Sequence, residues 1–129
     1  MDEQTKHYQA KLDYEIDPSD LKQALDRGEK IVVIDTRQPQ SYAQRHIPGA
    51  INLPHGTMSA ETTSHLDKSA LVVTYCDGIG CNGSTKGALS MHRLGFRVKE
   101  MMGGMEWWLR DGLETHGTES ATPNPSCNC

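Results

Sequence analysis

The stretch VVTYCDGIGCNGSTKGALSMHRLG, residues 72–95, carries the features that decide the fold. Its branched apolar start is typical of a buried strand, and the residues from Gly83 onward predict a helix that ends before Gly95. A glycine-rich loop joins the two elements and places Cys76 directly after the strand. Because ligands bind at the carboxyl ends of the strands in a parallel α/β sheet, we expect Cys76 to lie at a functional site.

The same succession of strands and helices continues on both sides of this stretch. Predicted strands cover residues 14–16, 30–35, 70–75 and 96–101, and a turn over residues 46–54 leads into another short strand. Predicted helices cover residues 18–27, 38–45, 59–66, 83–94 and 105–111. Strands that alternate with helices predict an α/β fold, in which a parallel sheet has helices on both faces.

The length of 129 residues is that of one ordinary domain. We expect residues 1–12 to form a mobile arm, residues 13–114 the domain, and residues 115–129, which are rich in Ser, Thr, Pro and Asn, a disordered tail. The net charge is −4, and the basic residues are interspersed with acidic ones and form no basic face. Nucleic acid is therefore not an expected partner. Without a leader-like segment or an apolar run of membrane-spanning length, we expect no membrane contact and a cytoplasmic location.

The loop after Cys76 is suited to bind an anion. Gly78, Gly80 and Gly83 allow tight turns and positive φ, so that successive backbone N–H groups can point inward. The start of the following helix adds the positive end of its dipole. We therefore expect a lowered pKa and a raised nucleophilicity for the Cys76 thiol. The predicted cradle for a persulfide or an oxyanion consists of Asp77, Gly78, Ile79, Gly80, Asn82 and Gly83.

The cysteines also leave other interpretations open. A single cysteine after a strand is often a small buried hydrophobic residue without a chemical role. Cys81 either packs at the helix start or reacts with a persulfide on Cys76, taking its outer sulfur or releasing sulfide as a disulfide forms. Cys127 and Cys129 form a second pair, and four cysteines in two pairs could bind zinc.

Three segments, in order, resemble the single-domain rhodaneses, a family of sulfurtransferases. They are IDTRQPQSYAQRHIPGAINLP at residues 34–54, VVTYC at residues 72–76 and LGFRVKEMMGGMEWW at residues 94–108. The resemblance covers about residues 14–114 and implies a five-stranded parallel sheet flanked by helices. It also implies transfer of a sulfane sulfur through a persulfide on Cys76, with Asp35 and Arg37 in a supporting role and with no metal or organic cofactor.

The loop CDGIGCN departs from the usual rhodanese pattern, because it is longer, has no cation and includes Asp77. A carboxylate there opposes a thiolate, so a persulfide-carrying protein is an alternative donor to thiosulfate, a small dianion. Phosphatases that share this fold need an arginine six residues after the cysteine, where this chain has Asn82. The predicted function is therefore a sulfurtransferase. The alternative is a non-catalytic thiol redox or sulfur-relay domain, and a phosphatase is disfavoured.

Overall fold

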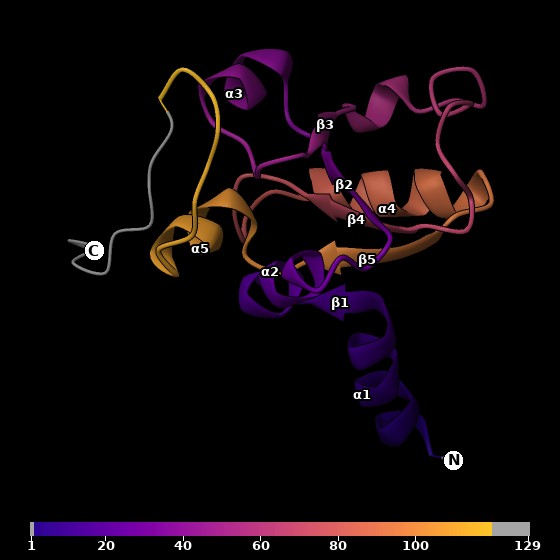
Figure 1. Cartoon of the computed structure of the whole chain (residues 1–129). Helices are drawn as coiled ribbons and strands as arrows, with labels where there is room; N and C mark the ends of the chain where they lie inside the picture. Colours follow the sequence, from indigo (N-terminus) through magenta and orange to yellow (C-terminus); the bar gives the residue numbers. More distant parts are fainter. Residues whose placement is uncertain (1, 120–129) are drawn as a thin grey trace.

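The computed structural model in Figure 1 describes residues 2–119. Five parallel strands form one sheet in the order β1-β5-β4-β2-β3, which confirms the expected α/β fold. The strands are β1 (Glu15–Ile16), β2 (Ile31–Asp35), β3 (Ile51–Asn52), β4 (Leu71–Tyr75) and β5 (Arg97–Met101). The helices are α1 (Glu3–Tyr14), α2 (Pro18–Asp26), α3 (Pro39–Gln44), α4 (Gly83–Arg93), α5 (Gly104–Arg110) and the 3₁₀ turn η1 (His55–Thr57). In the described part of the chain, no helix combines the length and apolar character needed to cross a membrane.

The central strands β2 and β4 end at the same level. Their register runs from Ile31 opposite Leu71 to Asp35 opposite Tyr75. The next residue after β2, Thr36, donates from its backbone N–H to the carbonyl oxygen of Tyr75 at 3.0 Å. The segment that follows Asp35 is therefore held beside the segment that begins with Cys76, although the two are far apart in the sequence.

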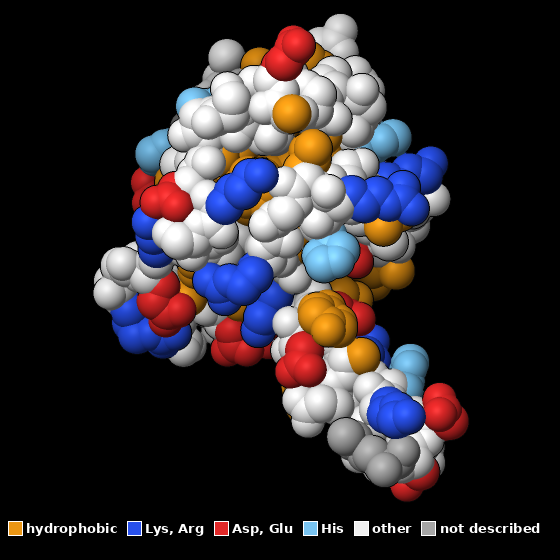
Figure 2. Space-filling model, turned by 90° about the vertical axis from the view of Figure 1, so that its right-hand side faces the viewer, with side chains coloured by type: hydrophobic (Ala, Val, Ile, Leu, Met, Phe, Trp, Pro, Cys, Tyr) orange, Lys and Arg blue, Asp and Glu red, His pale blue; other side chains and the backbone are white. Residues whose placement is uncertain are grey.

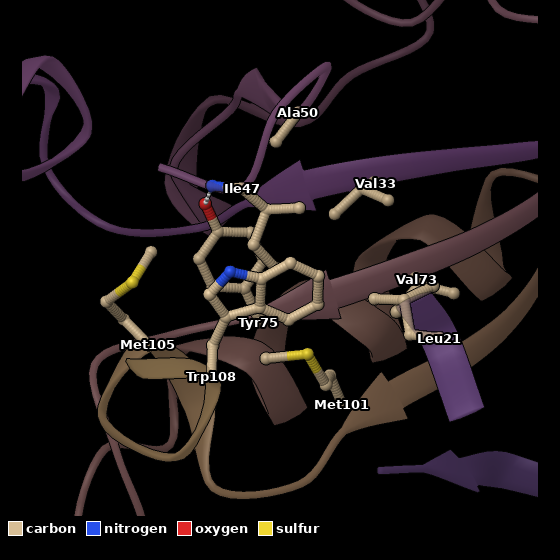
Figure 3. Close-up of a cluster of buried hydrophobic side chains, with 9 residues drawn as sticks. All are labelled: Leu21, Val33, Ile47, Ala50, Val73, Tyr75, Met101, Met105 and Trp108. Atoms are coloured by element: carbon tan, nitrogen blue, oxygen red, sulfur yellow. Dashed lines mark hydrogen bonds between the residues drawn. The ribbon is translucent and has the colours of Figure 1, made fainter. Parts of the chain in front are cut away.

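Helices cover both faces of the sheet, as predicted. On the face with α2 and α5, a buried apolar cluster fills the interface (Figure 3): Leu21, Val33, Ile47, Ala50, Val73, Tyr75, Met101, Met105 and Trp108. On the face with α4, a second cluster consists of Ile34, Val72, Met91 and Phe96. Since consecutive residues of a strand point to opposite faces, burial on both faces explains the continuous apolar runs of β2 and β4.

The helix predicted for residues 59–66 is not present, and the segment consists of turns. Its hydroxyl groups bond to the local backbone: the Ser59 N–H donates to Thr62 Oγ1 at 2.9 Å, and Thr63 Oγ1 donates to the Ser59 carbonyl at 2.7 Å. Ser and Thr side chains that bond in this way compete with helical hydrogen bonding. The prediction was wrong because the weak apolar pattern does not outweigh this competition.

Most of the expected N-terminal arm, residues 1–12, is helical. α1 begins after Asp2, whose carboxylate accepts a hydrogen bond from the Thr5 N–H at 2.7 Å. The helix buries no side chain and projects from the body of the molecule (Figures 1 and 2), so that Tyr8 and Leu12 are exposed. The mobility of this segment stays a prediction.

Residues 115–119 pack on the domain, beyond the boundary expected at residue 114. Thr115 is buried, and His116 pairs with His46 through two backbone hydrogen bonds of 2.8 and 2.9 Å. The N–H groups of Thr118 and Glu119 donate to the carbonyls of α3 residues at 3.0 and 2.8 Å. Backbone bonding, which composition does not reveal, extends the domain here. The rest of the predicted tail, with Cys127 and Cys129, lies outside the described residues.

Candidate active site

Cys76 follows β4 directly and is joined to Cys81 by a disulfide bond. The Cα atoms of the two residues are 6.2 Å apart, and the Cys81 N–H donates to the Gly78 carbonyl at 3.1 Å, which closes a tight turn between them. Cys76 is buried, with 5% of its surface exposed, whereas Cys81 is half-buried. The structure therefore brings the two cysteines of the loop into direct contact at the carboxyl end of the sheet.

The loop glycines do not adopt positive φ, so that part of the prediction was wrong, and two of the three serve close packing instead. None of Gly78, Gly80 and Gly83 has a positive φ. A Cβ atom on Gly78 would lie 2.8 Å from Glu106 Oε2, and one on Gly83 would lie 3.1 Å from Cys76 Sγ. A Cβ atom on Gly80 would meet nothing within 4 Å. Sequence alone does not distinguish these causes, because glycine is compatible with all of them.

The start of α4 lies against the two sulfur atoms. Gly83 is its first residue, and the same Cβ position would be 3.6 Å from Cys81 Sγ. Asn82 precedes the helix and provides no side-chain cap. The positive end of the helix dipole is thus near Cys76 Sγ.

The N-terminus of α5 supports the loop from the other side. The N–H groups of Met105 and Glu106 donate to the carbonyls of Cys76 and Asp77 at 2.9 and 2.8 Å. This approach requires Gly104, which has φ +59°, because a Cβ atom there would lie 2.5 Å from the Cys76 carbonyl oxygen. Sequence reasoning noticed the glycine pair 103–104 only as part of a family resemblance. The pair of glycines before a short helix was the available signal for a close backbone contact.

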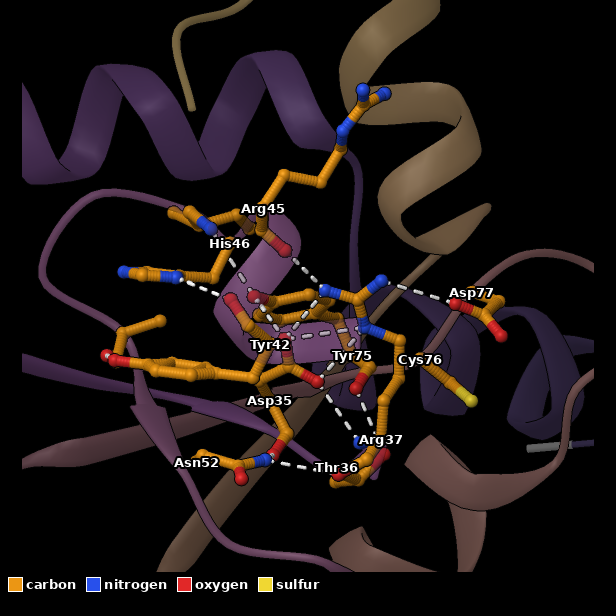
Figure 4. Close-up of polar contacts among 12 residues, drawn as sticks. Asp35, Thr36, Arg37, Tyr42, Arg45, His46, Asn52, Tyr75, Cys76 and Asp77 are labelled. Atoms are coloured by element: carbon orange, nitrogen blue, oxygen red, sulfur yellow. Dashed lines mark hydrogen bonds and ion pairs between the residues drawn. The ribbon is translucent and has the colours of Figure 1, made fainter. Parts of the chain in front are cut away.

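Asp35 and Arg37 form a buried ion pair beside the loop (Figure 4), with a distance of 2.8 Å between Nη2 and Oδ2. Arg37 also pairs with Asp77 at 3.1 Å and donates to the Arg45 carbonyl at 2.6 Å. Burial opposes the charge of Arg37, but its bonds to Asp35 and Asp77 raise its pKa above the ordinary value. The guanidinium therefore remains charged, and it is shared between the carboxylates of Asp35 and Asp77.

Tyr75 connects the same network to the segment before β3. Its hydroxyl donates to Asp35 Oδ2 at 2.8 Å and accepts from the Ile47 N–H at 3.1 Å. Burial, and then the charge of Asp35, raise the pKa of Tyr75 far above its ordinary value. The hydroxyl therefore remains a donor, and the carboxylate at the end of β2 is held in place.

A hollow of about 240 Å³ lies between the loop, the first turn of α4 and the end of β5. It is lined by Cys76, Gly78, Ile79, Gly80, Cys81, Asn82, Ser84, Thr85, Glu100, Met101, Met102, Gly103 and Gly104. Glu100 Oε2 accepts hydrogen bonds from the hydroxyls of Ser84 at 3.1 Å and Thr85 at 2.5 Å. None of these lining residues, all within the described part of the chain, is basic. The hollow gives access to Cys76 and has an acidic wall.

A family model for the rhodanese-like domain matches residues 17–111. The chain belongs to the rhodanese family. A sulfurtransferase of Allochromatium vinosum is 34% identical over 99 residues, or 77% of this chain and 91% of that protein. The thiosulfate sulfurtransferase GlpE of Pseudomonas fluorescens is 34% identical over 110 residues, or 84% of this chain and 93% of that protein. The crystal structure of the BH2092 protein from Bacillus halodurans has a TM-score of 0.88 and 42% identity, and covers 95% of this chain and 90% of that chain.

In this rhodanese, the predicted site residues lie together only in part. Cys76, Cys81 and Gly83 pack against one another, and Asp35 and Arg37 reach the loop through Asp77. Ile79 is exposed, and a Cβ atom on Gly80 would meet nothing within 4 Å. Sequence reasoning missed the opposite wall, formed by Ser84, Thr85 and Glu100. Glu100 is the fourth of the five residues of β5, so the rule that placed Cys76 at the carboxyl edge of the sheet could have found it.

The zinc interpretation needs a cluster of ligands. Between residues 2 and 119, no group of three or more His, Cys, Asp and Glu side chains is placed to hold a metal ion. The second cysteine pair of that interpretation, Cys127 and Cys129, lies outside the described residues. The described loop of this rhodanese thus provides two sulfur atoms and no further metal ligands around them.

Proposed function

We infer that this rhodanese transfers a sulfane sulfur from a donor to a thiophilic acceptor through a persulfide on Cys76. The observation that carries the proposal is the position of Cys76 Sγ, which lies against the first residue of α4 and lines the hollow. Relatives that are named thiosulfate sulfurtransferase support the same activity. The uncapped start of α4 beside the sulfur also supports the proposal, because the N-terminus of a helix favours an anion.

The reaction begins with the reduced cysteine. The Cys76 thiolate attacks the sulfane sulfur of the donor, a new S–S bond forms, and the remainder of the donor leaves; with thiosulfate the leaving group is sulfite. The outer sulfur of the persulfide then points into the hollow. A thiophilic acceptor attacks this sulfur, and the Cys76 thiolate leaves. The N–H groups at the start of α4 stabilise the thiolate and the persulfide anion in both steps.

The charges around the hollow bear on the choice of donor. Glu100 lies in the wall and no lining residue is basic, so a dianion such as thiosulfate enters against electrostatic repulsion. A persulfide of lower charge, carried by a small molecule or a protein, meets less repulsion. The alternative of a non-catalytic sulfur or redox relay shares the Cys76 chemistry but predicts negligible turnover with thiosulfate and cyanide.

Sulfur loading of the reduced full chain tests the proposal. We expect thiosulfate or a small persulfide to add the mass of one sulfur atom to the Cys81→Ser variant, and the same variant to form thiocyanate from cyanide. Both signals should disappear in Cys76→Ser, because this variant lacks the nucleophile. Loading without thiocyanate formation would favour the relay. The absence of loading with either donor would contradict the proposal.

The phosphatase alternative has a test of its own. The positions six residues after Cys76 and Cys81 are Asn82 and Gly87, so no arginine is available to clamp a phosphoryl group. We expect no hydrolysis of an aryl phosphate above that of Cys76→Ser.

A further inference from the structure

We propose that Cys81 expels the sulfur carried by Cys76 as sulfide, so that the protein also acts as a persulfide reductase that uses an external dithiol. The inference rests on the proposed persulfide at Cys76. It goes beyond sulfur transfer, because the sulfur leaves in reduced form and not on an acceptor. The observation behind it is the disulfide between the proposed nucleophile and the half-buried Cys81 of the same loop.

The loop holds the two sulfur atoms so that they react with each other. The hydrogen bond from the Cys81 N–H to the Gly78 carbonyl turns the chain back toward β4. Ile79, at the tip of this turn, is 76% exposed. Both sulfur atoms pack on Gly83: a Cβ atom built on this glycine would lie 3.1 Å from Cys76 Sγ and 3.6 Å from Cys81 Sγ. Both cysteines also line the hollow. Cys81 Sγ can therefore reach Cys76 Sγ, the inner sulfur of a persulfide.

The release step is balanced within the loop. Cys81 Sγ attacks Cys76 Sγ, the Cys76–Cys81 bond forms, and the bond between Cys76 Sγ and the outer sulfur breaks. The outer sulfur leaves as hydrosulfide with the proton of the Cys81 thiol. The sulfane sulfur is reduced to sulfide, and the two cysteines are oxidised to the disulfide. No oxidant is needed beyond the sulfane sulfur.

An external dithiol completes the cycle. Its thiolate attacks Cys81 Sγ, which belongs to the more exposed residue of the disulfide, and Cys76 leaves as a thiolate. The start of α4 favours this direction, because it stabilises the departing thiolate and a stabilised thiolate is the better leaving group. The second thiol of the reductant then closes its own disulfide and returns Cys81 to the thiol form.

A single-turnover experiment tests the proposal. Full-length protein with Cys127→Ser and Cys129→Ser, so that only two cysteines remain, is reduced, freed of reductant and mixed with a stoichiometric amount of thiosulfate or of a small persulfide. We expect nearly stoichiometric sulfide and a protein lighter by two hydrogen atoms. The same protein with Cys81→Ser should keep the added sulfur and release no sulfide. Omitting the dithiol excludes direct reduction of the outer sulfur.

Other outcomes separate this proposal from the proposed function. If the two-cysteine protein keeps its sulfur as stably as the Cys81→Ser protein, or if the sulfur moves to Cys81 without sulfide release, the reductase proposal is overturned while persulfide formation stands. If neither protein accepts sulfur from either donor, the proposed persulfide itself fails. One added sulfur atom on the Cys81→Ser protein shows that this variant still reacts at Cys76, so that its lack of sulfide release does not come from misfolding.

Discussion

Glu100 places a carboxylate in the wall of the hollow that leads to Cys76. Its Oε2 atom is fixed by the hydroxyls of Ser84 and Thr85 in the first turn of α4. At the scale of single residues, this charge distinguishes donors: it repels a dianion and has little effect on an uncharged molecule. The other carboxylates near the loop differ, because Asp77 is paired with Arg37 and Glu106 with Arg110.

We predict that Glu100→Gln accelerates sulfite release from thiosulfate by about fivefold at low salt, as expected for removal of one charge near the reacting atoms. Gln keeps an acceptor for the two hydroxyls, so the wall retains its shape. The rate of loading from an uncharged organic trisulfide should not change. Stopped assays of sulfite and of protein mass measure the two rates.

Glu106→Gln is the matched control, because it removes the same charge from a carboxylate that Arg110 already compensates. We expect a smaller acceleration with this variant. Equal acceleration by both variants, or equal effects on the charged and the uncharged donor, would show that Glu100 does not select among donors.

At the scale of elements, α5 fixes the position of the loop. Two N–H groups at the start of α5 bond to the first two carbonyls of the loop, and the left-handed conformation of Gly104 permits this contact. The chemistry at Cys76 therefore depends on a helix that follows β5 and provides no side chain that reacts.

We predict that Gly104→Ala lowers the free energy of unfolding by about 3 kcal/mol, from backbone strain and the contact of its Cβ with the Cys76 carbonyl. Sulfur loading should also slow, because the loop is displaced. Gly80→Ala is the control: its Cβ meets nothing within 4 Å, so we expect a change within about 0.5 kcal/mol. Urea unfolding and the loading assay measure both variants. Similar losses in the two variants would contradict the role of Gly104.

The elements show what sequence could and could not predict. β2 and β4 were predictable because a branched apolar run has few other interpretations, and Cys76 was located because it directly follows such a run. The structure of segment 59–66 was not predictable, because hydrogen bonds of its hydroxyl groups to the local chain decide it. The roles of Gly78 and Gly104 depend on neighbours far away in the sequence, and so does the contact between Glu100 and α4. Predicting these contacts would require the register of the sheet, which the sequence does not reveal.

At the scale of the whole molecule, the two ends of the described chain differ. α1 projects from the body and buries no side chain (Figure 1). Residues 115–119, in contrast, bury Thr115 and bond to the chain around α3 and His46. The stability of the domain therefore depends more on its C-terminal end than on its N-terminal helix.

We predict that truncation after residue 114 lowers the free energy of unfolding by about 2 kcal/mol relative to truncation after residue 119, which corresponds to about 8 °C in Tm. The shorter protein loses the backbone hydrogen bonds between His116 and His46. It also loses the buried Thr115, so that the surface that Thr115 covers becomes exposed to water. Deletion of residues 2–12 should change Tm by less than about 2 °C. Calorimetry of the three shortened proteins compares these values. Equal Tm values for the two C-terminal truncations would contradict the prediction.

Because of the hydrogen bonds between α5 and the loop, hydrogen exchange at the backbone of α5 reports when the loop opens. The amide hydrogens of Met105 and Glu106 exchange with deuterated water only when the carbonyls of Cys76 and Asp77 separate from them. Sulfur chemistry at Cys76 takes place at the side chain and leaves both carbonyls bonded. Slow exchange at these two positions in every oxidation state, with faster exchange in residues 78–82, is therefore the expected pattern of a loop whose base stays closed while its tip opens.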